Sequence, residues 1–175
     1  MNGMKRLVPA LLLAALAVGP AASQTSALKG HNSNAPVDVA ADRIEVQDRA
    51  DRAIFSGNVV VRQAELTLTA ARLTVAYSSG GGVELRRIDA TGGVTVRSPS
   101  ETAQGNVGIY DLERRIITLI GDVSLVQRDA RVNGGRLTID LDSGRAVMDG
   151  GGPPGTTRQG GRVTGTFTVP QKKGG

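Results

Sequence analysis

The chain has 175 residues, enough for one domain of ordinary size, with 24 glycines, 2% aromatic residues and no cysteine. The missing thiols exclude disulfides, thiolate zinc sites and cysteine nucleophiles. The formal charge of +5 comes from the two ends of the chain, since all 16 acids lie between residues 24 and 150. That near-neutral body argues against a nucleic-acid partner, which would call for a basic face on the folded part.

Residues 1–23 are predicted to be a cleavable secretory signal peptide. Lys5 and Arg6 supply the positive start, and residues 7–18 supply the apolar stretch. Residues 21–23 supply the small side chains that a signal peptidase needs, with cleavage expected before Ser23 or Gln24. An uncleaved anchor is the alternative, although the apolar stretch is short for a membrane span. The mature protein is therefore expected in the periplasm.

The chain from residue 24 to residue 31 is expected to be a flexible N-terminal segment. It ends at His31, the only histidine of the chain, which lies in a polar stretch and is expected to be a solvated loop residue. The folded domain is predicted over residues 32–169. It begins with a short alternating strand at residues 35–39.

Four repeats of strand pattern follow, each beginning with small residues and an alternating apolar run. They begin at Ala41, Ala70, Gly105 and Gly134. Sixteen residues after three of these starts comes a glycine, and in the second repeat the glycine comes after 22 residues because of a glycine-rich loop insertion at residues 78–82. The glycines are Gly57, Gly92, Gly121 and Gly150.

The glycine pairs Gly57-Asn58, Gly92-Gly93 and Gly121-Asp122 predict tight turns between antiparallel strands. Each repeat would then be about three short strands. The fold class is all-β, an antiparallel meander whose apolar face must fold over as a sandwich, jelly roll or curved trough.

Parity along the strands separates an inner from an outer face. The side chains expected to point inward are Val59, Val61, Val94, Val96, Val123 and Leu125. Near the strand ends, Arg62, Arg97 and Gln127 are expected at a rim or in solvent.

The C-terminal part is expected to hold a Gly/Pro-rich flexible stretch at residues 150–161, a last strand at 162–169 and a disordered tail at 170–175. Neither terminal strand carries obvious charged residues that would prevent another strand from pairing with it. These strands are therefore either ordinary edges of a monomer or sites of strand addition to other β-proteins. The residues expected at these edges are Val37, Asp38, Val39, Val163, Thr164, Thr166, Phe167 and Val169.

No catalytic or metal-binding pattern is visible. One histidine and no cysteine leave no nucleophile–base pair of the usual sort and no metal site, and no cofactor motif is present. Carboxylates are scattered at strand ends, and residues 140–144 fit a turn better than a calcium loop. Binding is therefore favoured over catalysis, with a polysaccharide-acting enzyme as the weaker alternative.

The interior must be built from small aliphatic side chains, because there are only two tyrosines, two phenylalanines and no tryptophan. Such a trough either receives acyl chains or is filled by its own Val, Leu and Ile side chains. A self-polymerising structural β-repeat without a lipid ligand remains the alternative function.

Several segments in order resemble the LptA/OstA family of periplasmic lipopolysaccharide-transport proteins. They are residues 32–43 (NSNAPVDVAADR), 55–63 (FSGNVVVRQ), 70–73 (AARL), 105–111, 119–123 (LIGDV) and 134–138 (GGRLT). The resemblance covers residues 32–169. The Gly/Pro-rich stretch departs from the family pattern, so the resemblance does not assign which residues form the C-terminal edge strand.

This resemblance implies a twisted β-jelly roll, open like a V, that holds lipid A acyl chains in its interior. It implies no enzymatic activity and no cofactor. Its N-terminal edge would dock on an inner-membrane bitopic partner of the same fold (LptC-like). Its C-terminal edge would dock on an outer-membrane translocon domain (LptD-like) or on another copy, head to tail.

Four positions match interior lipid-contacting positions of the family, namely Val37, Val96, Tyr110 and Leu112. The full set expected to line the lipid-binding interior is Val37, Val39, Ile44, Val46, Phe55, Val59, Val61, Leu73, Val75, Val94, Val96, Tyr110, Leu112, Leu119, Val123 and Leu125.

Overall fold

The computed structural model describes residues 31–128, 130–150 and 161–168. The signal peptide expected at residues 1–23, the segment 24–30, most of the Gly/Pro-rich stretch and the tail at 170–175 lie outside these residues. Val169, one of the expected docking residues, lies outside them too.

The described residues form one antiparallel sheet of ten strands, in the order β1-β3-β4-β5-β6-β7-β8-β10, with β2 also paired to β3 and β9 to β8. A 3-10 turn, η1 (Asp48–Ala50), joins β2 to β3. The strands are β1 (Val37–Ala40), β2 (Arg43–Gln47), β3 (Arg52–Gln63), β4 (Leu66–Ser78), β5 (Glu84–Arg97), β6 (Glu101–Asp111), β7 (Ile116–Gln127), β8 (Ala130–Asp140), β9 (Arg145–Asp149) and β10 (Thr164–Phe167).

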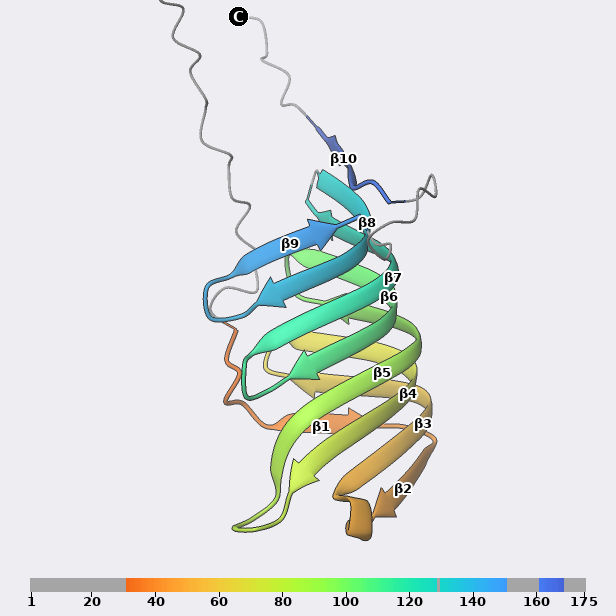
Figure 1. Ribbon diagram of the computed structural model, residues 1–175, viewed down its shortest axis with the longest axis vertical. Helices are drawn as coiled ribbons and strands as arrows, with labels where there is room; N and C mark the ends of the chain where they lie inside the picture. Colours follow the sequence, from red (N-terminus) through yellow and green to blue (C-terminus); the bar gives the residue numbers. More distant parts are fainter. Residues whose placement is uncertain (1–30, 129, 151–160, 169–175) are drawn as a thin grey trace, which may run out of the picture.

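The six long strands curve over along one side, so the sheet doubles back on itself as a twisted jelly roll shaped like a trough (Figure 1). We call its two walls arm A and arm B. Arm A holds β2, β9 and residues 52–56, 72–78, 84–91, 107–111, 116–120 and 136–140 of the long strands. Arm B holds β1, β10 and residues 59–63, 66–70, 94–97, 101–105, 123–127 and 130–134.

The glycine pairs lie at the bends of this sheet, and the prediction that they are turns between strands is wrong. Gly57 and Asn58 have φ angles of 79° and 45°, and the register of β3 with β4 shifts between Ser56 and Val59. Strand β3 pairs with the same neighbour before and after this bulge. Two left-handed residues therefore bend the strand without reversing it. The second and third repeats each hold one whole long strand and parts of its two neighbours, instead of three short strands.

In the first three repeats the second residue faces the glycine of the bulge. A Cβ built on Gly92 would lie 2.6 Å from the Cβ of Ala71, and one on Gly121 would lie 2.7 Å from Nδ2 of Asn106. Only glycine combines this close approach with a left-handed backbone at little cost. The spacing of 16 or 22 residues, counted from the first residue of a repeat, is thus one residue more than the separation of these facing residues in the sequence.

The core is built as rows of residues that are directly opposite each other on neighbouring strands. One row in arm A joins Leu73, Ala90, Gly108, Leu119 and Leu137, and four of these are fully buried hydrophobic residues. Fully buried valines of arm B face small residues, as in the pair of Val94 with Gly105. The small residues that begin the repeats therefore make room for the valines at the bend.

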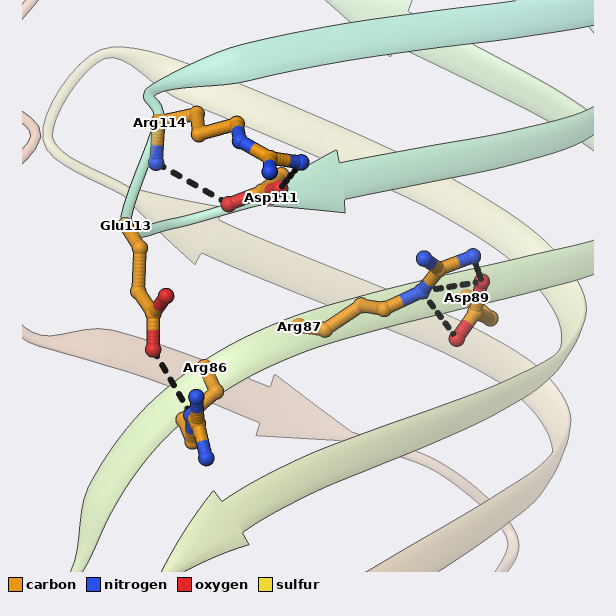
Figure 2. A network of polar contacts seen from close by, with 6 residues as sticks. All are labelled: Arg86, Arg87, Asp89, Asp111, Glu113 and Arg114. Atoms are coloured by element: carbon orange, nitrogen blue, oxygen red, sulfur yellow. Dashed lines mark hydrogen bonds and ion pairs between the residues drawn. The ribbon is translucent and has the colours of Figure 1, made fainter.

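The outer face of arm A carries ion pairs near the free ends of β5, β6 and β7 (Figure 2). Arg86 Nε lies 2.7 Å from Glu113 Oε1, and Arg87 Nη2 lies 2.8 Å from Asp89 Oδ1. These side chains are half exposed, so the pairs contribute little to stability. Their effect is to keep the outside of the trough polar while the inside is aliphatic.

Candidate functional site

An apolar groove of about 660 Å³ opens at the N-terminal end of the trough, between β1 and the free end of arm A. Val37 and Val39 line it from β1, and Phe55, Val75 and Leu85 line it from arm A. All five side chains are aliphatic or aromatic, so the wall of the groove offers dispersion contacts and few hydrogen bonds.

Polar groups lie at the rim of this groove. Asp48, Asp51, Tyr77 and Ser79 complete that part of its lining. Partial burial, followed by the carboxylates of Asp48 and Asp51, raises the pKa of Tyr77. The groove therefore combines an apolar wall with a polar, partly acidic rim, as an amphipathic ligand requires.

Two of the residues expected in the interior are exposed at this end. Ile44 is 56% exposed and Val46 is 57% exposed, both on β2. They lie opposite Phe55 and Ala53 in the register, so they face the inside, but no strand or arm covers them. They are exposed because β2 is an edge strand, and Val46 lines the groove. Their contact with a lipid stays a prediction.

The middle of the trough is filled by its own side chains. Val59, Leu73, Val94, Leu119 and Val123 are each at most 1% exposed. Expected interior residues that are also buried are Val61, Val75, Val96, Tyr110 and Leu125, and those that pack half-buried against them are Val37, Val39, Phe55 and Leu112. The inward direction of these side chains follows the alternation in the sequence, and contact with a lipid stays a prediction.

The mouth of the trough, where the free ends of the two arms meet, is closed by a hydrogen bond. The hydroxyl of Tyr110 in arm A donates to Oε1 of Gln63 in arm B at 3.2 Å. A cavity of only about 30 Å³ lies beside this pair, lined by Leu66 and Val96 of arm B and by Ile88 and Ile117 of arm A, among others. The resting mouth has room for about one water molecule.

His31 is part of this closure, and the expectation of a solvated loop histidine is wrong. The residue is 8% exposed, and its Nε2 lies 3.1 Å from Gln63 Oε1 while its Nδ1 lies 3.3 Å from Glu65 Oε1. A backbone hydrogen bond and, less strongly, the bond from His31 lower the pKa of Glu65. The polar sequence around His31 gave no sign of these partners, which lie more than 30 residues away.

Each end of the sheet is made of two half-length strands, and within the described residues no further strand pairs with their outer edges. At the N-terminal end β1 and β2 pair with the two halves of β3, and at the C-terminal end β10 and β9 pair with the two halves of β8. Val163 and Phe167 are 42% and 54% exposed at the C-terminal end. Sequence reasoning missed β9, whose residues 145–149 alternate only weakly.

Other lining residues were missed as site residues. They include Gln63, Leu66, Leu68, Ile88, Ile117, Tyr77 and Leu85. The alternation of Leu66 with Leu68 was a usable signal for the inner face. A polar residue such as Gln63 carries no such signal, because its role depends on a partner in the other arm.

Within residues 31–128, 130–150 and 161–168 we find no group of three or more His, Asp or Glu side chains placed to hold a metal ion. In the same part of the chain, none of the helical segments has the length and apolar character needed to cross a membrane. Asp140 accepts hydrogen bonds from the backbone of Asp142 and Ser143, so residues 140–144 form a turn, as expected.

Comparison with solved structures agrees with this architecture. LptH of Pseudomonas aeruginosa, the LptA homologous periplasmic component of the lipopolysaccharide transport device, superposes with a TM-score of 0.68 at 18% identity. The match covers 79% of this chain and 99% of LptH. The likeness concerns the fold.

Sequence comparisons identify relatives. An uncharacterized protein of Rhizobium meliloti is 31% identical over 147 residues, covering 80% of this chain and 79% of the relative. Lipopolysaccharide export system protein LptA of Haemophilus influenzae is 24% identical, covering 75% and 80%. LPS-assembly protein LptD of Yersinia pestis is 30% identical, but the match spans only 16% of LptD. The model of the family described as "LptA/(LptD N-terminal domain) LPS transport protein" matches residues 38–145, and the chain belongs to this family.

Proposed function

We propose that this protein is a non-enzymatic periplasmic carrier that binds lipopolysaccharide and bridges the inner- and outer-membrane parts of a transport machine. The observation that carries the proposal is the 660 Å³ groove, whose apolar wall continues into the aliphatic interior of the trough. Family membership supports the identity of the ligand.

The groove matches the chemistry of an acyl chain. Each methylene removed from water contributes about 0.8 kcal/mol, so ten methylenes contribute about 8 kcal/mol before the cost of ordering the lipid. The acidic and hydroxyl groups at the rim would remain in contact with the polar headgroup and solvent. The groove is thus the place where acyl chains first meet the protein.

The packed middle of the trough sets a condition on this binding. Leu73 and Leu119 are fully buried. An acyl chain can contact them only when arm A and arm B move apart. We therefore propose that an acyl chain contacts Val37, Val39 and Phe55 while the trough is closed. It would contact deeper residues such as Val96 and Tyr110 only after the trough has widened.

The open edges support the bridging part of the proposal. Unpaired backbone groups on β1 and β2 can continue the sheet into an inner-membrane partner of the same fold, and those on β9 and β10 into the N-terminal domain of an outer-membrane translocon. Head-to-tail pairing of two copies uses the same edges. Such pairing would join successive troughs into one apolar path.

Photo-crosslinking tests lipid binding directly. A photo-reactive residue at Phe55, in the groove, should give a lipopolysaccharide adduct in cells, and one at Thr95, on the outer face of arm B, should not. Equal labelling at both positions, or labelling at Thr95 alone, would contradict the proposal. A protein that forms filaments with no adduct at either position would instead be the self-polymerising repeat.

A further inference from the structure

Residues 31–36, which lead into β1, cross the mouth of the trough and contact both arms. We call this segment the strap. Gln63 Nε2 in arm B donates to the backbone oxygens of Ser33 and Ala35, at 2.9 and 3.0 Å. On the other side, Arg115 Nη2, at the end of the β6–β7 turn, donates to Oδ1 of Asn34 at 3.3 Å. Figure 1 shows the segment running past the β6–β7 turn before it reaches β1.

Gln63 joins the strap to the closed mouth. Because its amide nitrogen donates to the strap, its oxygen is free to accept from Tyr110 and from His31 Nε2. One buried side chain thus holds the two arms and the strap together. Losing the Gln63 side chain would take this bond from the Tyr110 hydroxyl and from His31 Nε2 at once, which is costly for buried polar groups.

The strap also lies between the closed and the open parts of the trough. Val37, the first residue of β1, lines both the 30 Å³ cavity at the mouth and the 660 Å³ groove. A chain that moves from the groove into the middle must pass this point. Since the strap continues directly into β1, a partner that docks on the β1 edge acts on the same segment.

We propose that the strap is a gate: it locks the mouth of the trough closed, and lipid passes from the groove into the interior only when its contacts with Gln63, Glu65 and Arg115 are released. This inference rests on the proposed function for the nature of the ligand. The gate itself is a property of the fold and can be measured without lipid.

The first experiment measures the opening of the mouth. The chain has no cysteine, so a Val96→Cys variant carries a single thiol in the cavity at the mouth. Adding His31→Ala and Asn34→Ala releases two tethers of the strap. We expect the thiol to react with a maleimide at least tenfold faster in the released protein. The Val96→Cys variant with Thr95→Ala, on the outer face, is the matched control and should react at the original rate. An unchanged rate in the released protein would overturn the gate.

The second experiment measures lipid uptake. In a His31→Cys, Glu65→Cys variant, a short reducible reagent that reacts with a thiol at each end fixes the strap to the β3–β4 turn, beside arm B. Uptake of fluorescent lipopolysaccharide should be at least fivefold slower than after reduction, while single-cysteine variants capped with a monofunctional reagent should show no such difference. Equal uptake by the bridged and reduced forms would overturn the gate and leave the carrier function standing. Absence of uptake by the unmodified protein would contradict the carrier function, and with it the passage of lipid through the gate.

Discussion

Tyr110 and Gln63, 47 residues apart in the chain, are joined by a hydrogen bond of 3.2 Å that links the free ends of the two arms. The Tyr110→Phe substitution keeps the ring and removes the donor. We expect a loss of about 1 kcal/mol in the free energy of unfolding, together with a more open mouth. Denaturant unfolding measures the free energy of unfolding. A double-mutant cycle with Gln63→Leu gives the coupling energy between Tyr110 and Gln63. A coupling energy near zero would show that the bond does not hold the arms together.

The bends of the sheet depend on glycine. Gly92 has φ of 83°, and a Cβ at this position would lie 2.6 Å from the Cβ of Ala71. Gly92→Ala should therefore cost about 2 kcal/mol or more, from the left-handed backbone and the steric clash. Gly81→Ala, in the β4–β5 loop with no atom within 4 Å of the new methyl group, is the control and should change stability little. Similar costs for both substitutions would contradict the role of the bulge.

The packed middle of the trough should be sensitive to cavities. Leu119 is fully buried, and Leu119→Ala should cost about 3 kcal/mol in the free energy of unfolding. Val83→Ala, at a residue 76% exposed at the groove, should cost less than about 0.5 kcal/mol. If Leu119→Ala were as mild as Val83→Ala, the arms would not be packed at rest.

The strand edges should control association. Ile44→Lys on β2 and Phe167→Lys on β10 place charges on exposed apolar positions, 56% and 54% exposed, at opposite ends of the sheet. Each should weaken head-to-tail association at least tenfold in sedimentation experiments without lowering the melting temperature. Thr95→Lys, on the outer face away from both edges, should leave association unchanged. If all three variants associate equally, edge docking is wrong.

The turn between β8 and β9 should give a pH-dependent contribution to stability. Backbone hydrogen bonds, that from Ser143 above all, lower the pKa of Asp140 in the folded protein. A depressed folded-state pKa means that the contribution is fully present above the unfolded value, about 3.9, and is lost as pH falls through the folded one. The stability difference between the native protein and Asp140→Asn should therefore narrow from pH 5 to pH 2. A constant difference over this range would contradict the assignment.

The sequence predicted most of the fold because its signals are local and repeated. The alternation of Val94 with Val96 marked the inner face, and the small residues at the repeat starts marked the repeat. The sequence could not show whether a glycine pair forms a hairpin turn or a bulge. Two left-handed residues reverse the chain in a hairpin, but they only bend it within a long strand. Only the register of β3 with β4 on both sides of Gly57 separates these cases.

The site was predictable only where it is apolar. Val37, Val39 and Phe55 belong to the set expected in the interior, and they line the groove. The strap did not follow from the sequence, because His31 and Gln63 acquire their roles from each other and from Tyr110. Long-range polar contacts between polar residues leave no periodic signal.

Native mass spectrometry of the protein purified from cells tests the carrier function most directly, because it reports bound lipid and oligomeric state together. We predict a species carrying one lipopolysaccharide per protomer, which disappears on delipidation and is reduced at least fivefold by a Phe55→Asp substitution in the groove. A spectrum that shows only the masses of the protein and its oligomers, and that does not change on delipidation, would contradict the carrier function.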